Sequence, residues 1–321
     1  MTTKSAKFIN VDTFYDYMFV EKRKSGNIIK YYLVHSYREN HKVNKIRKYL
    51  GQNLSEKELK QAKDKAKYHI LKILKELNTE VFLFTLTKNQ INKLNKYDKK
   101  IKIIHFDRKD WQRFTEEFVY NTNAIEGSGI QRDEVPEILH KQKVSDEEEI
   151  ETKGVAKAVD YIRETKEDLS INLIKKLHEI CFKGSKSFAG KLRNVEVVIR
   201  NSKGEVMHQG VISSQLKIVL RDMISWCEEN NYKFKPLVLA AIIHNQFEYV
   251  HPFQDGNGRV GRLLLNYILL KNKYPPINIT LEDRQKYYMS LQEYQKNKNL
   301  KPTLEFLVKQ YKKTLRRVTT K

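Results

Sequence analysis

The feature that most constrains the fold is a glycine-rich segment between two apolar stretches. The segment reads HPFQDGNGRVGR and covers residues 251–262. Residues 237–250 before it are mostly apolar, and the apolar runs 263–265 and 268–270 follow it. Apolar stretches of this length and spacing are typical of buried helices. The sequence therefore predicts a tight loop that joins two core helices of a helical domain.

The residue types in this loop suit the binding of a polyphosphate. Glycines allow a tight turn and a close approach of the backbone to a ligand. The backbone N–H groups of Gly256, Asn257 and Gly258 can form an anion site at the positive N-terminus of the next helix. Arg259 and Arg262 are three residues apart, so both can face the same anion.

Two further residues give the loop the means for chemistry. Asp255 is a hard oxygen ligand of the kind that Mg²⁺ prefers when it bridges phosphates. A histidine ordinarily titrates near neutrality, so His251 is the candidate general base. A satisfied core histidine beside an ordinary turn is the alternative explanation. The combination of phosphate cradle, metal ligand and base within twelve residues favours an active site.

This segment resembles the signature of the Fic (filamentation-induced-by-cAMP) family, HxFx[D/E]GNGRxxR, and matches every fixed position. The resemblance extends over residues 111–307 and implies an all-helical core with a β-hairpin flap. The sequence AGKLR at 189–193, followed by strand-like segments at 195–200 and 205–209, is similar to the family's flap region. We therefore expect a mainly α protein, in which a small α+β module precedes the Fic core.

The resemblance implies an activity, protein adenylyl transfer, in which AMP passes from ATP to a Ser, Thr or Tyr hydroxyl of a protein. His251 would deprotonate that hydroxyl, and Asp255 would hold Mg²⁺. The α- and β-phosphates would be bound by Gly256, Asn257, Gly258 and Arg259, and the γ-phosphate by Arg262. The modified protein would include the chain itself, and relatives with this arrangement are often homodimers.

Further nucleotide contacts are implied in the flap and near the C-terminus. Ile199 and Arg200 of the flap and Tyr287 would line the nucleotide site. Tyr287 and the neighbouring Tyr288 could equally be core aromatics. Gln295 stands where many relatives have Asn, so the adenine contacts remain open. His208 and His244 read as structural or surface residues.

An acidic residue upstream of the core is a candidate inhibitor. From the residues alone, Glu126 is an exposed acid near the end of a helix that stops at Gly127. One class of the family carries an inhibitory helix at this place. There, Glu126 would pair with Arg262 and occupy the γ-phosphate position. In some relatives the same Glu helps to remove AMP from modified proteins, so a deAMPylase or a bifunctional enzyme is an alternative.

The first third of the chain is strongly basic and forms the expected N-terminal module, residues 1–105, before the Fic domain of residues 106–321. Its patterns predict a three-stranded meander over 15–20, 28–36 and 42–50, and then helices over 55–77 and 88–97. Cations alternate with aromatics in these strands, as in proteins that bind single-stranded nucleic acid. A nucleic-acid-binding regulator is thus an alternative of another class, although a solvated Lys-rich face explains the same pattern.

Composition narrows the choice of partners, of cysteine chemistry and of location. A formal net charge of +22 favours anionic partners. The two cysteines, Cys181 and Cys227, form no metal-binding or disulfide pattern. We expect a cytoplasmic protein, because the N-terminus has no apolar signal segment and the longest apolar run is too short to cross a membrane.

Overall fold

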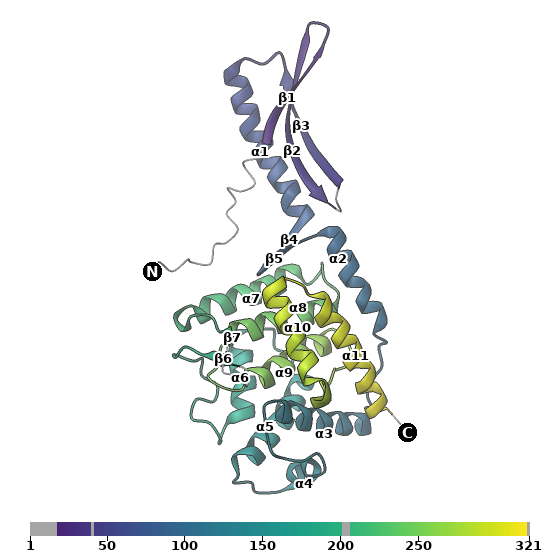
Figure 1. The fold of residues 1–321 in the computed structure, drawn as a ribbon, viewed down its shortest axis with the longest axis vertical. Helices are drawn as coiled ribbons and strands as arrows, with labels where there is room; N and C mark the ends of the chain where they lie inside the picture. Colours follow the sequence, from purple (N-terminus) through teal and green to yellow (C-terminus); the bar gives the residue numbers. More distant parts are fainter. Residues whose placement is uncertain (1–17, 40–41, 201–205, 320–321) are drawn as a thin grey trace. The chain divides into compact units, whose positions relative to one another are not determined.

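The computed structural model describes residues 18–39, 42–200 and 206–319. The chain divides into two compact units, one of residues 1–80 with 85–89 and the other of residues 81–84 with 90–321. The domain boundary expected between residues 105 and 106 stays a prediction. The mainly helical fold with a small N-terminal sheet confirms the predicted fold class (Figure 1).

The first unit is an antiparallel meander packed on one helix. Strands β1, β2 and β3 and helix α1 cover Met18–Ser25, Ile28–Glu39, Lys42–Gln52 and Glu56–Leu77. Helix α1 starts where the sequence predicts, because Ser55 and Glu58 form a reciprocal capping box. Its apolar side, Ala66, Ile70 and Leu74, packs on Leu33 of β2. The predicted meander is confirmed, and the start of its first predicted strand lies outside the described residues.

A short hairpin and a short helix follow α1 in the sequence. They are β4 (Asn78–Val81), β5 (Phe84–Thr87) and α2 (Lys88–Asn95). The sequence analysis did not predict this hairpin. Its turn contains Phe82, which has a φ of +47°, in place of the Gly or Asn that normally marks such a turn. The turn therefore lacked the residue pattern by which hairpins are found in a sequence.

The second unit is mostly helical and contains the flap hairpin. Its helices α3 to α7 are Arg108–Ile125, Glu134–His140, Glu147–Glu164, Ile171–Phe182 and Leu216–Asn230. Helices α8 to α11 are Pro236–Val250, Asn257–Lys271, Arg284–Asn297 and Lys301–Val318. Short 3-10 helices lie at Lys96–Lys100, Ser213–Gln215 and Leu281–Asp283. Strands β6 (Val198–Arg200) and β7 (Val206–Gln209) form the hairpin that the sequence predicts.

Helices α8 and α9 are the centre of the second unit. Nearly all residues of both helices are buried, including their polar ones. Helix α8 packs on α7, α9, α10 and α11, while α9 also packs on α3, α5 and α6. The loop that joins α8 to α9 is the motif segment, so the core holds both of its ends in place. This arrangement gives the segment a rigid frame, as a preorganised site requires.

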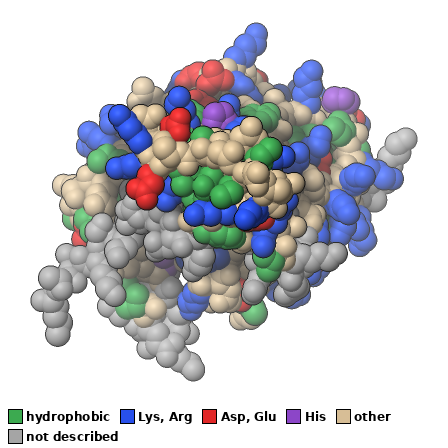
Figure 2. All heavy atoms as spheres, turned by 90° about the horizontal axis from the view of Figure 1, so that it is seen from above, with side chains coloured by type: hydrophobic (Ala, Val, Ile, Leu, Met, Phe, Trp, Pro, Cys, Tyr) green, Lys and Arg blue, Asp and Glu red, His purple; other side chains and the backbone are tan. Residues whose placement is uncertain are grey.

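The surface carries the basic excess of the sequence. On the face drawn in Figure 2, Lys and Arg side chains are widely scattered and acidic side chains are few. Of the helices in the described ranges, none is both long enough and apolar enough to cross a membrane.

Candidate active site

The motif loop is held in shape by its own residues. His251 ends α8 with a left-handed backbone at φ +51°, and Gly256 precedes α9 with φ +77°. The side chain of Asn257 closes the loop: its Oδ1 accepts from the N–H of Phe253 and its Nδ2 donates to the carbonyl of Phe253, both at 2.8 Å. A Cβ atom on Gly256 would lie 2.3 Å from the ring of Phe182, so only glycine fits there.

The N-terminus of α9 offers free backbone donors. The first helical hydrogen bond joins the N–H of Val260 to the carbonyl of Gly256 at 3.1 Å. The amides of Asn257, Gly258 and Arg259 therefore lie outside the helix's own hydrogen-bond ladder. Together with the helix dipole they form an anion-binding position.

Arg262 lies on the second turn of α9 and is almost completely buried, with 1% of its surface exposed. Its Nε donates to Thr122 Oγ1 at 2.7 Å, and its Nη2 donates to the Thr122 carbonyl at 3.0 Å. Nη2 also pairs with Glu126 Oε1 at 2.7 Å. Its Nη1 is buried and has no hydrogen-bond partner within the described part of the chain. A buried charged donor without a partner is costly, which points to a ligand that supplies an acceptor.

Glu126 is placed at the end of α3, where it acts as the C-cap residue. Its carboxylate lies over the start of α9, since a Cβ atom on Gly258 would be 2.2 Å from Oε1 of Glu126 and 3.0 Å from Nη1 of Arg262. The carboxylate thus occupies the space beside Gly258 that an anion bound at this helix N-terminus would need. The structure brings together Glu126, Gly258 and Arg262 from parts of the sequence more than a hundred residues apart.

Arg259 points to a different partner from Arg262. Its guanidinium forms a buried ion pair with Glu151 of α5 and lies 4.3 Å from the ring centroid of Phe182. Its Nη2 is 3.5 Å from Oδ2 of Asp255. The two arginines of the motif therefore do not share one partner, and Arg259 ties α9 to α5.

His251 has the protonation state that a general base needs. Its Nδ1 faces the carbonyl of Glu248 at 3.4 Å, which places the ring proton on Nδ1 and leaves the Nε2 lone pair available. Burial lowers the pKa of His251 to about 4, and nearby His208 acts in the same direction. The ring is therefore neutral at physiological pH.

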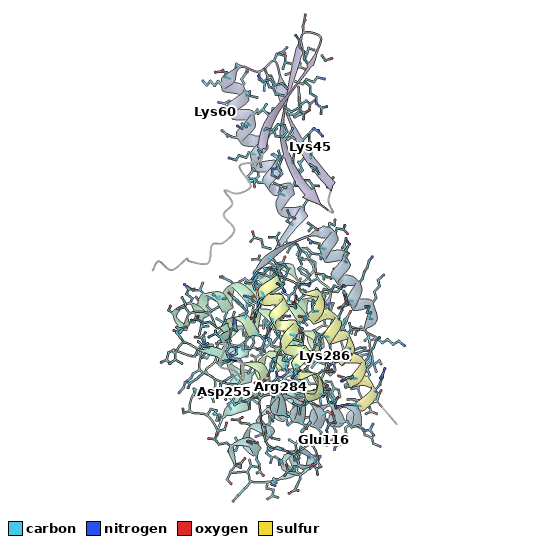
Figure 3. All side chains as sticks on the ribbon, viewed as in Figure 1. Lys45, Lys60, Glu116, Asp255, Arg284 and Lys286 are labelled. Atoms are coloured by element: carbon cyan, nitrogen blue, oxygen red, sulfur yellow. The ribbon has the colours of Figure 1, made fainter. Side chains whose placement is uncertain are left out.

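Asp255 is the one acidic side chain of the motif and is half-exposed (Figure 3). Its Oδ1 accepts from the N–H of Gly256 at 2.6 Å, so Oδ2 is the oxygen turned to Arg259. In the described ranges, no group of three or more His, Cys, Asp or Glu residues could hold a metal. One carboxylate at the phosphate position fits Mg²⁺, which usually binds one or two carboxylates and completes its shell with substrate phosphates and water.

Arg193 joins the motif loop to the flap, a role that the sequence did not reveal. Its Nε donates to the carbonyl of His251 at 2.7 Å, and its backbone N–H donates to Pro252 at 3.0 Å. Its guanidinium also binds the carbonyls of Val195 and Val211, at the two ends of the hairpin. Arg193 is therefore a positioning residue that holds the flap beside His251.

The two flap residues named from the sequence, Ile199 and Arg200, lie in β6, where Ile199 pairs with His208 of β7. The positions of their side chains are not among those described. The flap tip, residues 201–205, also lies outside the described residues. His208 faces the motif, because its Nε2 lies 2.7 Å from the carbonyl of Tyr249 and its ring is 6.4 Å from that of His251.

Tyr287 lies in the core below Arg262. Its ring centroid is 5.8 Å from the Arg262 guanidinium, and its hydroxyl donates to Nε2 of His244 at 2.9 Å. Nδ1 of His244 in turn donates to the carbonyl of Gly261 at 2.9 Å. His244 is thus a structural residue, which was one of the two interpretations from the sequence (structural or surface). Tyr288 donates weakly to Ile125 at 3.4 Å, and Gln295 is partly exposed on α10.

Two more residues behind the loop escaped the sequence analysis. His178 of α6 accepts the Gly190 N–H on Nδ1 at 2.9 Å, and its Nε2 donates to the Asp255 carbonyl at 3.1 Å. Glu248 is buried on α8 against Gly261, and burial raises its pKa to about 8. Neither residue lies in a recognisable motif. The one signal in the sequence is that each is a polar or charged residue within a largely apolar helix.

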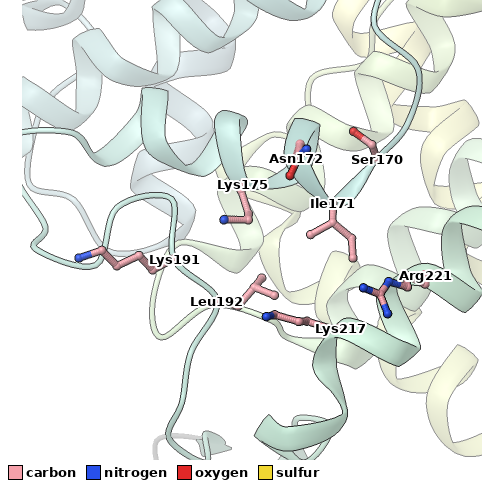
Figure 4. A pocket seen from close by; sticks show the side chains of 8 residues that line it. All are labelled: Ser170, Ile171, Asn172, Lys175, Lys191, Leu192, Lys217 and Arg221. Carbon is pink, nitrogen blue, oxygen red and sulfur yellow. The ribbon is translucent and has the colours of Figure 1, made fainter.

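A pocket of about 540 Å³ lies apart from the motif residues (Figure 4). It is lined by residues of α6, α7 and the segment before the flap, including Lys175, Lys191, Lys217 and Arg221. The described residues that line it include no acid, so the pocket is suited to an anionic group.

The fold and the loop define a helical domain that presents an anion-binding helix N-terminus beside a neutral histidine. Residues 168–269 match the Fic/DOC family. The chain therefore carries a Fic domain.

Relatives agree with this assignment. The protein adenylyltransferase fic-1 of Caenorhabditis elegans is 29% identical over 215 residues, which are 62% of this chain and 40% of the relative. The protein adenylyltransferase Fic of Nematostella vectensis is 26% identical over 207 residues, 61% of this chain and 47% of the relative. The chain thus spans less than half the length of these curated relatives.

Solved structures share the fold. A Fic-domain-containing signalling protein from Bacteroides thetaiotaomicron has a TM-score of 0.59 at 23% identity and covers 71% of this chain and 94% of its own. A Fic family protein from Desulfovibrio desulfuricans has a TM-score of 0.61 at 21% identity and covers 73% and 74%.

Proposed function

We propose that the chain is a protein adenylyltransferase that moves AMP from ATP to a hydroxyl of a protein, and that Glu126 restrains it. Relatives that carry this activity by name match 61–62% of this chain. The protein substrate, self-modification and assembly as a homodimer are parts of the same proposal.

The observation that carries the proposal is the buried Nη1 of Arg262, which has no partner among the described residues and faces the glycine at the start of α9. A phosphate oxygen is the acceptor that a guanidinium and a helix N-terminus together bind best. The Glu126 carboxylate, already in this place, acts as the stand-in for such an anion.

The chemistry follows from the neutral His251. Its Nε2 takes the proton of the target hydroxyl, and the oxygen then attacks the α-phosphorus of ATP. A bond forms between the hydroxyl oxygen and the α-phosphorus, and the bond from that phosphorus to the pyrophosphate oxygen breaks. The amides of residues 257–259 and the guanidinium of Arg262 stabilise the charge on the phosphates. Arg193 and His178 hold the loop in its conformation through hydrogen bonds to its backbone carbonyls.

Mg²⁺ is the metal that fits the donors. Asp255 would hold it through its carboxylate, with the remaining ligands from phosphate oxygens and water. Bound there, the ion would supply positive charge that neutralises the phosphates. Removal of divalent ions with a chelator should therefore weaken nucleotide binding.

Removal of AMP is a second candidate, favoured by the free oxygen of Glu126. Oε1 pairs with Arg262, whereas Oε2 has no hydrogen-bond partner in the described ranges and the side chain is 30% exposed. An exposed carboxylate oxygen near the phosphate position can orient a water molecule for attack on an AMP ester. Both reactions would use the same loop.

The test uses a Glu126→Gly background, in which the proposed restraint is absent. The chain is incubated with ATP labelled on the α-phosphate or, separately, on the γ-phosphate, and protein-bound label is measured. Label from the α-phosphate alone is expected, and His251→Ala should lower it by a factor of about 10²–10⁴. Transfer of γ-label, or full transfer by the His251→Ala variant, would contradict the proposal.

A further inference from the structure

The N-terminal sheet has one face covered by α1 and an opposite face on which most of the described side chains are exposed. Leu33 of β2 packs on α1, and its neighbours in the strand, Tyr32 and Val34, point to the opposite side. The strand register places Phe19 and Arg47 beside Val34 on that side. Val34 is itself buried, and we call the residues around it on this side the open face; they are Phe19, Glu21, Arg23, Lys30, Tyr32, Lys45, Arg47 and Tyr49.

Aromatic rings lie on all three strands of the open face, exposed on β1 and β3 and half-buried on β2. Phe19 on β1 is 47% exposed and Tyr49 on β3 is 49% exposed. Tyr32 on β2 lies between them, with its ring centroid 5.4 Å from that of Tyr49. Large rings held on a sheet in this way are expensive to leave in water, and they offer flat surfaces for stacking.

Cations surround these rings. The Arg23 guanidinium lies 5.1 Å from the ring centroid of Tyr32, and Lys30 and Lys45 lie on the same face. The acid of this face, Glu21, is held by Arg23 at 2.7 Å and by Arg47 at 3.1 Å. Two arginines therefore neutralise one carboxylate, and the open face keeps a positive charge.

The charge of the whole sheet has the same sign. Residues 18–52 contain nine Lys and Arg residues but only two acids, Glu21 and Glu39. Such a charge attracts any polyanion. The alternation of cations and rings is more selective, because it matches the phosphates and bases of a single strand. An acidic peptide would meet the cations but has no counterpart for the row of rings.

We propose that the open face binds single-stranded nucleic acid, with bases stacked on the rings and phosphates bound by the surrounding cations. Sheets of comparable width stack two or three bases. The proposal concerns the residues of the sheet alone and does not depend on the transfer chemistry proposed for the second unit.

The first experiment tests the rings, with the full chain and a fluorescein-labelled single strand of 20 nucleotides of mixed sequence, as DNA and as RNA. Anisotropy should show binding that Tyr49→Ala weakens about tenfold, because each stacked base contributes on the order of 1–3 kcal/mol. Tyr49→Phe keeps the ring and should bind like the wild type. Tyr68→Ala is the matched control, since Tyr68 is 71% exposed on α1 and outside the open face.

The second experiment tests the cations through the salt dependence. Lys45 lies on the open face and Lys60 lies on α1 (Figure 3). Lys45→Gln should reduce the slope of log K against log salt concentration by about 0.7, the value for one phosphate contact on a single strand. Lys60→Gln should leave that slope unchanged.

Three results would overturn the proposal. One is equal loss of binding in the Tyr49→Ala and Tyr68→Ala variants. Another is binding of the corresponding duplex that matches single-strand binding and is unaffected by Tyr49→Ala. A third is displacement of the labelled oligonucleotide by polyglutamate as effectively as by an unlabelled oligonucleotide with the same number of charges at the same concentration. Charge alone would then explain the binding.

Discussion

At the scale of single residues, Arg262 connects the anion site to the proposed inhibitor. Arg262→Ala should lower AMP transfer, because the buried guanidinium that would bind the γ-phosphate is lost. Glu126→Gly should then give little further change, since its partner is already absent. Transfer rates of the two single variants and the double variant form the cycle that measures this coupling. Strictly additive effects would mean that the ion pair has no part in control.

The low pKa of His251 predicts how the rate of AMP transfer depends on pH. Because burial lowers its pKa to about 4, its base form is already complete near pH 6. The rate of AMP transfer by the Glu126→Gly variant should rise with pH between about 3.5 and 5 and then show no step near 6.5 that belongs to His251. A rate profile at saturating ATP checks this. A clear midpoint near 6.5 that disappears when His251 is replaced would contradict the assigned environment.

Sequence reasoning reached some residues of the site and missed others for a physical reason. The contact of Glu126 with Arg262 was predicted, because both residues lie in recognisable segments. Arg193 and His178 were not given roles, since each acts on a backbone carbonyl of the motif loop from another element. A carbonyl leaves no trace in the side-chain pattern, so only the packed structure reveals such partners.

At the scale of elements, the crossing of α5 and α6 depends on one glycine. A Cβ atom on Gly154 would lie 2.2 Å from the backbone oxygen of Cys181, and backbone atoms cannot move aside easily. Gly154→Ala should therefore lower the free energy of unfolding by at least about 2 kcal/mol, as for other overpacked sites. Gly129→Ala is the control, because its nearest neighbour would be a side-chain oxygen at 3.8 Å. Denaturant unfolding of both variants makes the comparison, and equal stabilities would refute the close crossing.

The helices of the second unit were largely predictable, because apolar periodicity and capping residues mark them. Helix α6, Ile171–Phe182, begins directly after the capping residue Ser170, and α1 begins where the sequence predicts. The β4–β5 hairpin was not predictable, because its turn uses Phe82 where a glycine is usual. An element can be predicted from the sequence when its local residue pattern agrees with its structure. This hairpin lacks such a pattern, so its formation depends on packing.

At the scale of the whole molecule, two buried histidines make stability depend on pH. Burial lowers the pKa of His178 and of His244 to about 4, below the value near 6.5 that they have in an unfolded chain. Above pH 6.5 both states are neutral and the full stability is present. As the pH falls from 6.5 towards 4, only the unfolded chain takes up these protons, so stability is lost, by roughly 3 kcal/mol for each histidine at most. Urea unfolding at pH 7.5 and 5.0 checks this, and equal free energies at the two values would contradict it.

One compact unit carries a basic sheet and the other carries the glycine-rich loop, and the sequence indicated both features. The basic excess of the first third falls on the meander, and the glycine-rich segment falls between the two central helices of the other unit. What the sequence could not supply is the distance between Glu126 and the start of α9, which depends on how α3 packs against α9. That packing is the basis of the proposed control.

The rate of AMP transfer after removal of Glu126 tests the central claim most directly. Label from α-labelled ATP is followed into the protein for the wild type, for Glu126→Gly and for Glu116→Ala, which removes another acid of α3 (Figure 3). Without the carboxylate beside Gly258, Arg262 becomes available to the nucleotide. Glu126→Gly should therefore be at least about tenfold faster than the wild type, a change of about 1.4 kcal/mol, while Glu116→Ala should match the wild type. Equal rates for all three proteins, with ATP bound equally well, would show that Glu126 does not hold the site closed.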